Sequence, residues 1–158
     1  MKFQKISEEH VRKILETVRI DSPRYDEVQF LKYTGIDRYV WICCFDDSNE
    51  PAALATVCED NPEKGTTYVA EIQAFRKGNG FGTALLDFIK KTYVKVWLMC
   101  DVHAGDSLKR LYRRSGMIEF IVPESIYDCP ASFFRTRQVD GDMIEAYVKQ
   151  CFSKNCFS

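Results

Sequence analysis

The sequence has little net charge, no long apolar run and no paired-cysteine motif, and each absence excludes a class of protein. Its 22 basic and 23 acidic residues leave a formal net charge of −1, too small for a long-range field that attracts nucleic acid or an anionic membrane. No apolar run approaches the roughly 20 residues that span a bilayer, and residues 1–10 lack the apolar core of a signal peptide. We therefore expect a cytoplasmic protein that binds neither nucleic acid nor a membrane.

The cysteines also argue against a common class of site. There are seven, an odd number, and none forms a CxxC pair. Several lie inside apolar runs, where a free cysteine behaves as a small hydrophobic residue. We expect reduced thiols and no metal site.

What the chain does have is the composition of an ordinary globular domain. Hydrophobic residues make up 46% of it and charged residues 28%, and its 158 residues suit one hydrophobic core. We expect a single domain over residues 1–158, with a loose tail at about 152–158.

The hydrophobic periodicity alternates between strand and helix. Ser7 can cap a first helix, and three antiparallel strands are expected before a glycine-rich loop. The helix after this loop should bury Ala84, Leu85, Phe88 and Ile89. The pattern predicts an α/β chain with strands at 1–6, 38–45, 52–58, 66–75, 94–102, 117–122 and 132–137, and helices after Ser7 and at 26–33, 83–93, 105–116 and 140–152.

The loop "KGNGFGT" at residues 77–83 carries three glycines between an expected strand and an expected helix. Glycine permits positive φ and close approach to the main chain, so several backbone N–H groups can point at one anion. The helix that begins at about Gly82 adds its positive dipole end, and Lys77 adds a charge. An isolated Gly-Asn-Gly is more often a plain tight turn, but the strand-to-helix position favours a pyrophosphate ligand.

At these residues the chain resembles the GNAT superfamily of acyl-CoA-dependent N-acyltransferases. The family signature, Arg or Gln followed by x-x-Gly-x-Gly/Ala, matches Lys77, Gly80 and Gly82, and the preceding strand aligns Ile72 and Ala74 with the family's hydrophobic residue and proline. Lysine in place of Arg or Gln and alanine in place of proline are departures. Neither removes a backbone donor, but the second leaves the exit of the strand uncertain.

A second segment, "LYRRSGM" at residues 111–117, resembles the family's Leu-Tyr-x-x-x-Gly-Phe helix end, with Met117 in place of Phe. Many family members carry Asn seven residues before the tyrosine, where this chain has Gly105. The order of expected elements also matches the family over most of the chain. The resemblance implies a GNAT-like, mixed, mostly antiparallel sheet flanked by helices.

The resemblance implies a function: transfer of an acetyl group from acetyl-CoA to a primary amine by direct attack in a ternary complex. Tyr112 would be the general acid that protonates the departing thiolate, although periodicity alone fits a core tyrosine equally well. Glu71 would accept the amine's proton, although a strand glutamate usually faces solvent. Acetyl-CoA would be bound by two segments of the chain: Ile72, Gln73 and Ala74; and Lys77, Gly78, Asn79, Gly80, Phe81, Gly82 and Thr83.

Other candidate residues have weaker support. His103 follows a strand end but is a single loop histidine, and His10 is expected on the surface. The basic stripe on the 105–116 helix is usually solvated, but it could attract the ribose phosphate of CoA or an acidic acceptor. The aromatic group in the last strands is expected in the core more than in an acceptor pocket. These two sets are Lys109, Arg110, Arg113 and Arg114; and Phe120, Tyr127, Phe133 and Phe134.

Two rival functions remain open. A non-catalytic acyl-CoA-binding or protein-interaction module could keep the fold and lose the chemistry. A dinucleotide-binding protein is a lesser alternative, because the loop resembles GxGxxG and Asp101 follows about 20 residues later. The acceptor could be a small molecule, a peptide or a protein, and exposed strands near the carboxyl end could pair in a homodimer.

Overall fold

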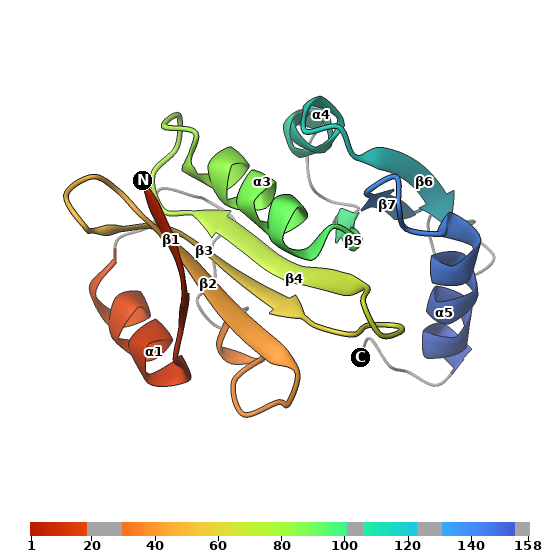
Figure 1. Ribbon diagram of the computed structural model, residues 1–158, viewed down its shortest axis with the longest axis horizontal. Coiled ribbons are helices and arrows are strands. Elements are labelled where there is room, and N and C mark those ends of the chain that lie inside the picture. The colour runs from red at the N-terminus through yellow and green to blue at the C-terminus, as the bar shows by residue number, and fades with distance from the viewer. Residues whose placement is uncertain (19–29, 101–105, 123–130, 154–158) are drawn as a thin grey trace.

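The computed structural model describes residues 1–18, 30–100, 106–122 and 131–153, and its centre is a mixed sheet (Figure 1). The strand order across these residues is β1-β2-β3-β4-β5-β7-β6. The strands are β1 Lys2–Ile6, β2 Tyr39–Phe45, β3 Pro51–Cys58, β4 Thr67–Ala74, β5 Val96–Cys100, β6 Ile118–Val122 and β7 Ala131–Arg135. The helices are α1 Glu8–Thr17, α3 Phe81–Tyr93, α4 Asp106–Arg114 and α5 Gly141–Ser153.

The pairing of the strands confirms the expected fold class. Among the described strands only β4 and β5 run parallel, and α3 connects them as a βαβ crossover. The other five pairs are antiparallel. The doubly wound parallel sheet of a dinucleotide-binding fold therefore does not form.

The helices divide the core between the two faces of the sheet. On one face, α3 and α4 pack on alternate residues of β2 to β5, including Ile42, Ala55 and Leu98. On the other face, α1 covers Trp41 and its neighbours, and α5 covers Trp97 and its neighbours. In Figure 1, α3 lies along β4, and α4 lies towards the β6 and β7 end of the sheet.

The helix boundaries follow local sequence signals closely. The Ser7 hydroxyl accepts a hydrogen bond from the His10 N–H at 3.2 Å and caps α1, as expected. The helix α3 begins at Phe81, one residue before the expected start. Its buried residues are Leu85, Leu86 and Ile89, so the expected apolar face omitted Leu86 and included the half-buried Ala84 and Phe88.

Strand β4 contains a bulge that changes which side chains share a face. Thr56 lies opposite Glu71 and Val57 opposite Val69, so Ala70 is an extra residue. Val69 and Ile72 consequently both contact the core beneath α3, although an odd separation would place them on opposite faces of a regular strand. The bulge therefore re-aims the end of β4 that approaches the glycine loop.

Some expected elements fall partly outside the described residues. Of the helical segment expected at 26–33, residues 26–29 lie outside, and Phe30 is buried against Trp41. The last two residues of the strand expected at 94–102 also lie outside. Residues 152 and 153, expected in the loose tail, belong to α5, and residues 154–158 lie outside the description.

Candidate active site

A cavity of about 430 Å³ opens where β4 and β5 separate. The two strands pair only from Thr67 opposite Val96 to Val69 opposite Leu98. Beyond Val69, β4 is bonded to β3 alone, which leaves backbone groups on its other edge available to a ligand. The cavity is lined by Ile72, Gln73, Ala74, Lys77, Gly78, Gly82, Leu86, Leu108, Leu111, Tyr112 and Arg114.

The glycine loop turns tightly and keeps its backbone donors unused. Gly78 and Gly80 have φ of +79° and +74°, a region that side chains disfavour, and Gly80 is the N-cap of α3. None of the N–H groups of residues 78–83 donates to another described residue. A Cβ atom built on Gly82 would stand 3.5 Å from the Ala74 Cβ, so the helix start packs closely on the end of β4.

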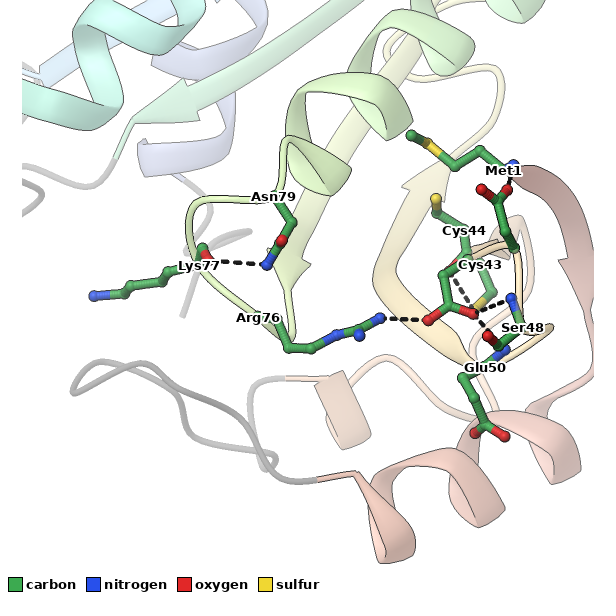
Figure 2. A network of polar contacts seen from close by, with 10 residues as sticks. Met1, Cys43, Cys44, Ser48, Glu50, Arg76, Lys77 and Asn79 are labelled. Atoms are coloured by element: carbon green, nitrogen blue, oxygen red, sulfur yellow. Dashed lines mark hydrogen bonds and ion pairs between the residues drawn. The ribbon is translucent and has the colours of Figure 1, made fainter.

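A side-chain hydrogen bond holds the loop in shape. The Asn79 side-chain amide donates to the Lys77 carbonyl at 3.1 Å. Figure 2 shows Lys77 extending away from the loop, while Arg76 turns the other way, towards the β2–β3 turn. Lys77 has no acidic partner among the described residues.

Arg76 ties the loop to the rest of the fold. Its guanidinium donates to the Asp46 carboxylate at 2.7 Å, a contact drawn as a dashed line at Arg76 in Figure 2. The guanidinium also lies 5.1 Å from the Phe81 ring centroid. Asp46 also accepts from the N–H groups of Ser48 and Glu50, each at 2.9 Å. These backbone hydrogen bonds and the bond from Arg76 lower the pKa of Asp46 below its ordinary value of 3.8.

Tyr112 projects from α4 into the core beside the cavity. It is 5% exposed, its ring lies 5.1 Å from that of Phe134, and no hydrogen bond joins its hydroxyl to another described residue. Burial, followed by the charges of Cys100 and Glu71, raises the pKa of its phenol well above 10, so Tyr112 stays protonated at neutral pH.

The end of α4 is fixed by a glycine cap at Gly116. Gly116 has φ of +80°, its N–H donates to the Arg113 carbonyl, and the Met117 N–H donates to the Tyr112 carbonyl at 3.1 Å. Met117 is buried, which completes a Schellman motif. The backbone of Tyr112 is therefore anchored directly.

Glu71 lies on the other face of the sheet from Tyr112. It is half-buried on β4, where its neighbour Ile72 faces α3. Burial and the charge of Glu71 raise the pKa of Tyr33, and the same charge contributes to the raised pKa of Tyr112. The Glu71 carboxylate thus acts on phenols from both sides of the sheet.

The structure brings most of the sequence-predicted cofactor residues together. Of the twelve proposed site residues, seven line the cavity, whereas Glu71, Asn79, Gly80, Phe81 and Thr83 do not. Three further lining residues, Leu86, Leu108 and Leu111, had no predicted site role. Arg114 was expected only as part of the basic stripe.

The structure places several of the site candidates that had weaker support from the sequence. His10 is exposed, as expected, and Phe133 and Phe134 are fully buried core residues. Arg113 is exposed, as expected for the stripe, and forms an ion pair with Glu119. His103 and Tyr127 lie outside the described residues.

Three other features of the described residues concern metal binding, cysteines and membrane spans. No group of three His, Cys, Asp or Glu side chains in these residues could hold a metal ion. Five cysteines in these segments are buried: Cys43, Cys44, Cys58, Cys100 and Cys151. None of the helices in the described segments is long and apolar enough to cross a membrane.

Comparison with known sequences gives no match to a family model and none to a curated protein. Comparison with solved structures gives many. A Bacteroides thetaiotaomicron protein assigned to the GNAT family of acetyltransferases is 18% identical, with a TM-score of 0.67 over 95% of this chain and 94% of its own.

Two further structures are named for specific activities or ligands. The ribosomal-protein-S18-alanine N-acetyltransferase from Escherichia coli is 14% identical, with a TM-score of 0.60 over 89% of this chain and 97% of its own. A Bacillus subtilis acetyltransferase in complex with CoA is 14% identical, with a TM-score of 0.60 over 87% and 99%. At these identities the likeness shows the fold, and the chain has the fold of the GNAT acetyltransferases.

Proposed function

We propose that the protein is an N-acetyltransferase that transfers an acetyl group from acetyl-CoA to a primary amine by direct attack in a ternary complex. The observation that carries the proposal is a single cavity lined by the glycine loop, the unpaired edge of β4 and the buried Tyr112. In the proposal, the chain acts as one domain over residues 1–158.

The residues present fit acetyl-CoA as the donor. The unused N–H groups of residues 78–83 and the start of α3 suit a pyrophosphate, and Lys77 supplies a positive charge beside them. The backbone of Ile72, unpaired towards β5, suits an amide of the pantetheine arm, and Leu86 and Leu111 provide apolar walls. The Ala74 carbonyl already accepts a hydrogen bond from the Gln73 side-chain amide at 2.7 Å. The complex of the Bacillus subtilis protein with CoA supports this assignment.

The donor's thioester supplies an activated acetyl group, and the protein's residues manage the protons. Tyr112 donates its phenolic proton to the sulfur as the C–S bond breaks and the C–N bond forms. Its raised pKa keeps that proton in place until charge develops on the thiolate. Glu71 accepts the proton that the attacking nitrogen loses, directly or through a water molecule.

The placement of the two groups suits simultaneous binding of both substrates. Tyr112 lies on the α3 and α4 face of the sheet, while Glu71 lies on the α1 and α5 face. The donor and the amine can therefore approach the gap between β4 and β5 from opposite faces. This arrangement favours direct transfer over a covalent acetyl-enzyme.

The acceptor class is a primary amine on a small molecule, a peptide or a protein. The likeness to an Escherichia coli enzyme named for a ribosomal-protein alanine is consistent with the peptide option. A carboxylate at Glu71, close enough to shift the pKa of Tyr33, also suits an acceptor that arrives as a cation.

The test is amine-dependent release of CoA from acetyl-CoA, measured with a thiol reagent over a panel of amines. Each primary amine is paired with its N,N-dimethyl derivative, which keeps the charge but has no transferable proton after attack. We expect turnover with at least one primary amine, none with its dimethyl partner, and intersecting double-reciprocal plots. Binding of acetyl-CoA without turnover on any amine would contradict the enzyme assignment and leave a non-catalytic acyl-CoA-binding module.

A further inference from the structure

Two basic side chains, Lys77 and Arg114, line the same cavity from different elements. Lys77 precedes the glycine loop, and Arg114 lies in the last turn of α4. Neither forms an ion pair with any acid in the segments that the structure describes. Lys77 beside the loop is enough to provide a positive charge for the pyrophosphate, so the role of Arg114 has to be explained separately.

Neighbouring basic residues on α4 differ from Arg114 in their surroundings. Arg113 forms an ion pair with Glu119, and its Nε donates to the same carboxylate at 2.8 Å. Arg110 is exposed, as Arg114 is, but it does not line the cavity. Arg114 follows Leu111 by three residues, which brings it to the edge of the apolar face that borders the cavity. Within this stripe, only Arg114 lines the cavity.

An arginine in the last turn of a helix can simply stabilise the terminal carbonyl groups. In α4 that role is filled by other groups. Lys90 donates to the Ser115 carbonyl, and the N–H groups of Gly116 and Met117 bond the carbonyls of Arg113 and Tyr112. The helix end therefore does not require the guanidinium of Arg114.

We propose that Arg114 binds the 3′-phosphate on the ribose of the CoA donor and makes the site selective for CoA over donors that lack this phosphate. The inference rests on the proposed function. In CoA the 3′-phosphate is separated from the pyrophosphate by one ribose ring, so its partner must lie beside the glycine loop. Arg114 and Gly78 border one cavity, and a guanidinium can bind a phosphate through two parallel hydrogen bonds.

The test is calorimetric measurement of Kd for acetyl-CoA and for 3′-dephospho-acetyl-CoA, without an acceptor amine. The wild-type protein should bind acetyl-CoA about tenfold more tightly than the dephospho form, as expected for one charge-assisted contact. Arg114→Gln should lose this preference by weakening acetyl-CoA about tenfold, with little change for the dephospho donor. The matched control, Arg110→Gln on the same helix, should keep the preference.

The possible outcomes distinguish a failure of this inference from a failure of the proposed function. Equal weakening of both donors by Arg114→Gln would overturn the inference and assign Arg114 to the pyrophosphate, and no weakening would overturn it outright. If the wild-type protein binds neither donor, the proposed function fails as well. Arg114→Lys, which keeps the charge without the planar fork, should retain part of the preference for acetyl-CoA over the dephospho form.

Discussion

The two ends of β4 have opposite roles. At the first end, Thr67 and Val69 are buried, and the strand is paired with β3 on one edge and β5 on the other. Tyr68 there stacks on Trp97 with ring centroids 4.4 Å apart. At the second end, residues 70–74 are half-buried, bonded only to β3, and lead into the glycine loop.

The difference shows how one strand can serve both stability and binding. The first end, residues 67–69, is the closed end: it buries apolar surface on both faces, and its backbone N–H and carbonyl groups are hydrogen-bonded to two neighbouring strands. The second end, residues 70–74, is the open end: it has no strand partner on one edge, at the point where the bulge at Ala70 turns Ile72 towards α3. We expect mutations at the closed end to reduce stability, and mutations around the open end to reduce binding or turnover.

The largest expected effect is on stability at the closed end. Leu98 is 2% exposed and lies opposite Val69. Leu98→Ala should lower the free energy of unfolding by about 2 to 5 kcal/mol, because it removes buried contacts and leaves a cavity. Chemical denaturation would measure the change. Ile121→Ala, at a side chain that is 61% exposed, is the control and should have little effect. Similar losses of unfolding free energy in Leu98→Ala and Ile121→Ala would contradict the stabilising role of the closed end.

The next effect is on chemistry at the open end. Tyr112→Phe should reduce kcat by on the order of 10², or about 2.7 kcal/mol of transition-state stabilisation, with the Kd for acetyl-CoA nearly unchanged. Initial rates and calorimetry would separate the two quantities. Tyr147→Phe removes a hydroxyl that accepts a hydrogen bond from Asn61 at 3.2 Å, far from this chemistry, and should keep full turnover. An unchanged rate in Tyr112→Phe would remove that residue from the mechanism.

A smaller effect is expected from the contact that fixes the loop. Asp46→Asn should weaken acetyl-CoA binding by about threefold to tenfold, because Arg76 loses its ionic partner while Lys77 and the backbone donors remain. The control Glu145→Gln breaks the surface pair with Lys149 and should leave Kd unchanged. Equal Kd values for wild type and Asp46→Asn would show that the contact does not position the loop.

The same variant has a pH signature with a defined sign. The pKa of Asp46 is lowered in the folded state, so its carboxylate stabilises the fold above the ordinary pKa of 3.8. This contribution is lost as the pH falls through the lower, folded value. The thermal midpoints of wild type and Asp46→Asn should therefore differ at neutral pH and converge in acid. A difference that grows as the pH falls would contradict this assignment.

Much of this arrangement could be predicted from the sequence, because local signals set it. Apolar runs bounded by turn residues predict β2, β3 and β4, Ser7 and Gly116 mark helix ends, and the spacing of Leu108, Leu111 and Tyr112 predicts the face that borders the cavity. The glycine loop can be recognised in the sequence because the positive φ of Gly78 and Gly80 favours glycine.

The remaining features depend on contacts between residues far apart in the chain. The bulge at Ala70 depends on the register with β3, and the Asp46–Arg76 pair joins residues 30 positions apart. The four basic residues of α4 look alike in sequence, and only packing assigns Arg113 to Glu119 and Arg114 to the cavity. Sequence periodicity carries no information on such pairings.

The most direct test of the open end as a donor site is the thermal midpoint with saturating acetyl-CoA, in wild type and Gly82→Leu. Gly82 lines the cavity without positive φ, so leucine there should fill the cavity with little backbone strain; Ala146→Leu, on the exposed face of α5, is the control. Acetyl-CoA at about 100 times Kd should add roughly 2.7 kcal/mol to wild type and the control, a rise of several degrees, and nothing to Gly82→Leu. No shift in the wild-type protein, or an equal shift in Gly82→Leu, would contradict the account.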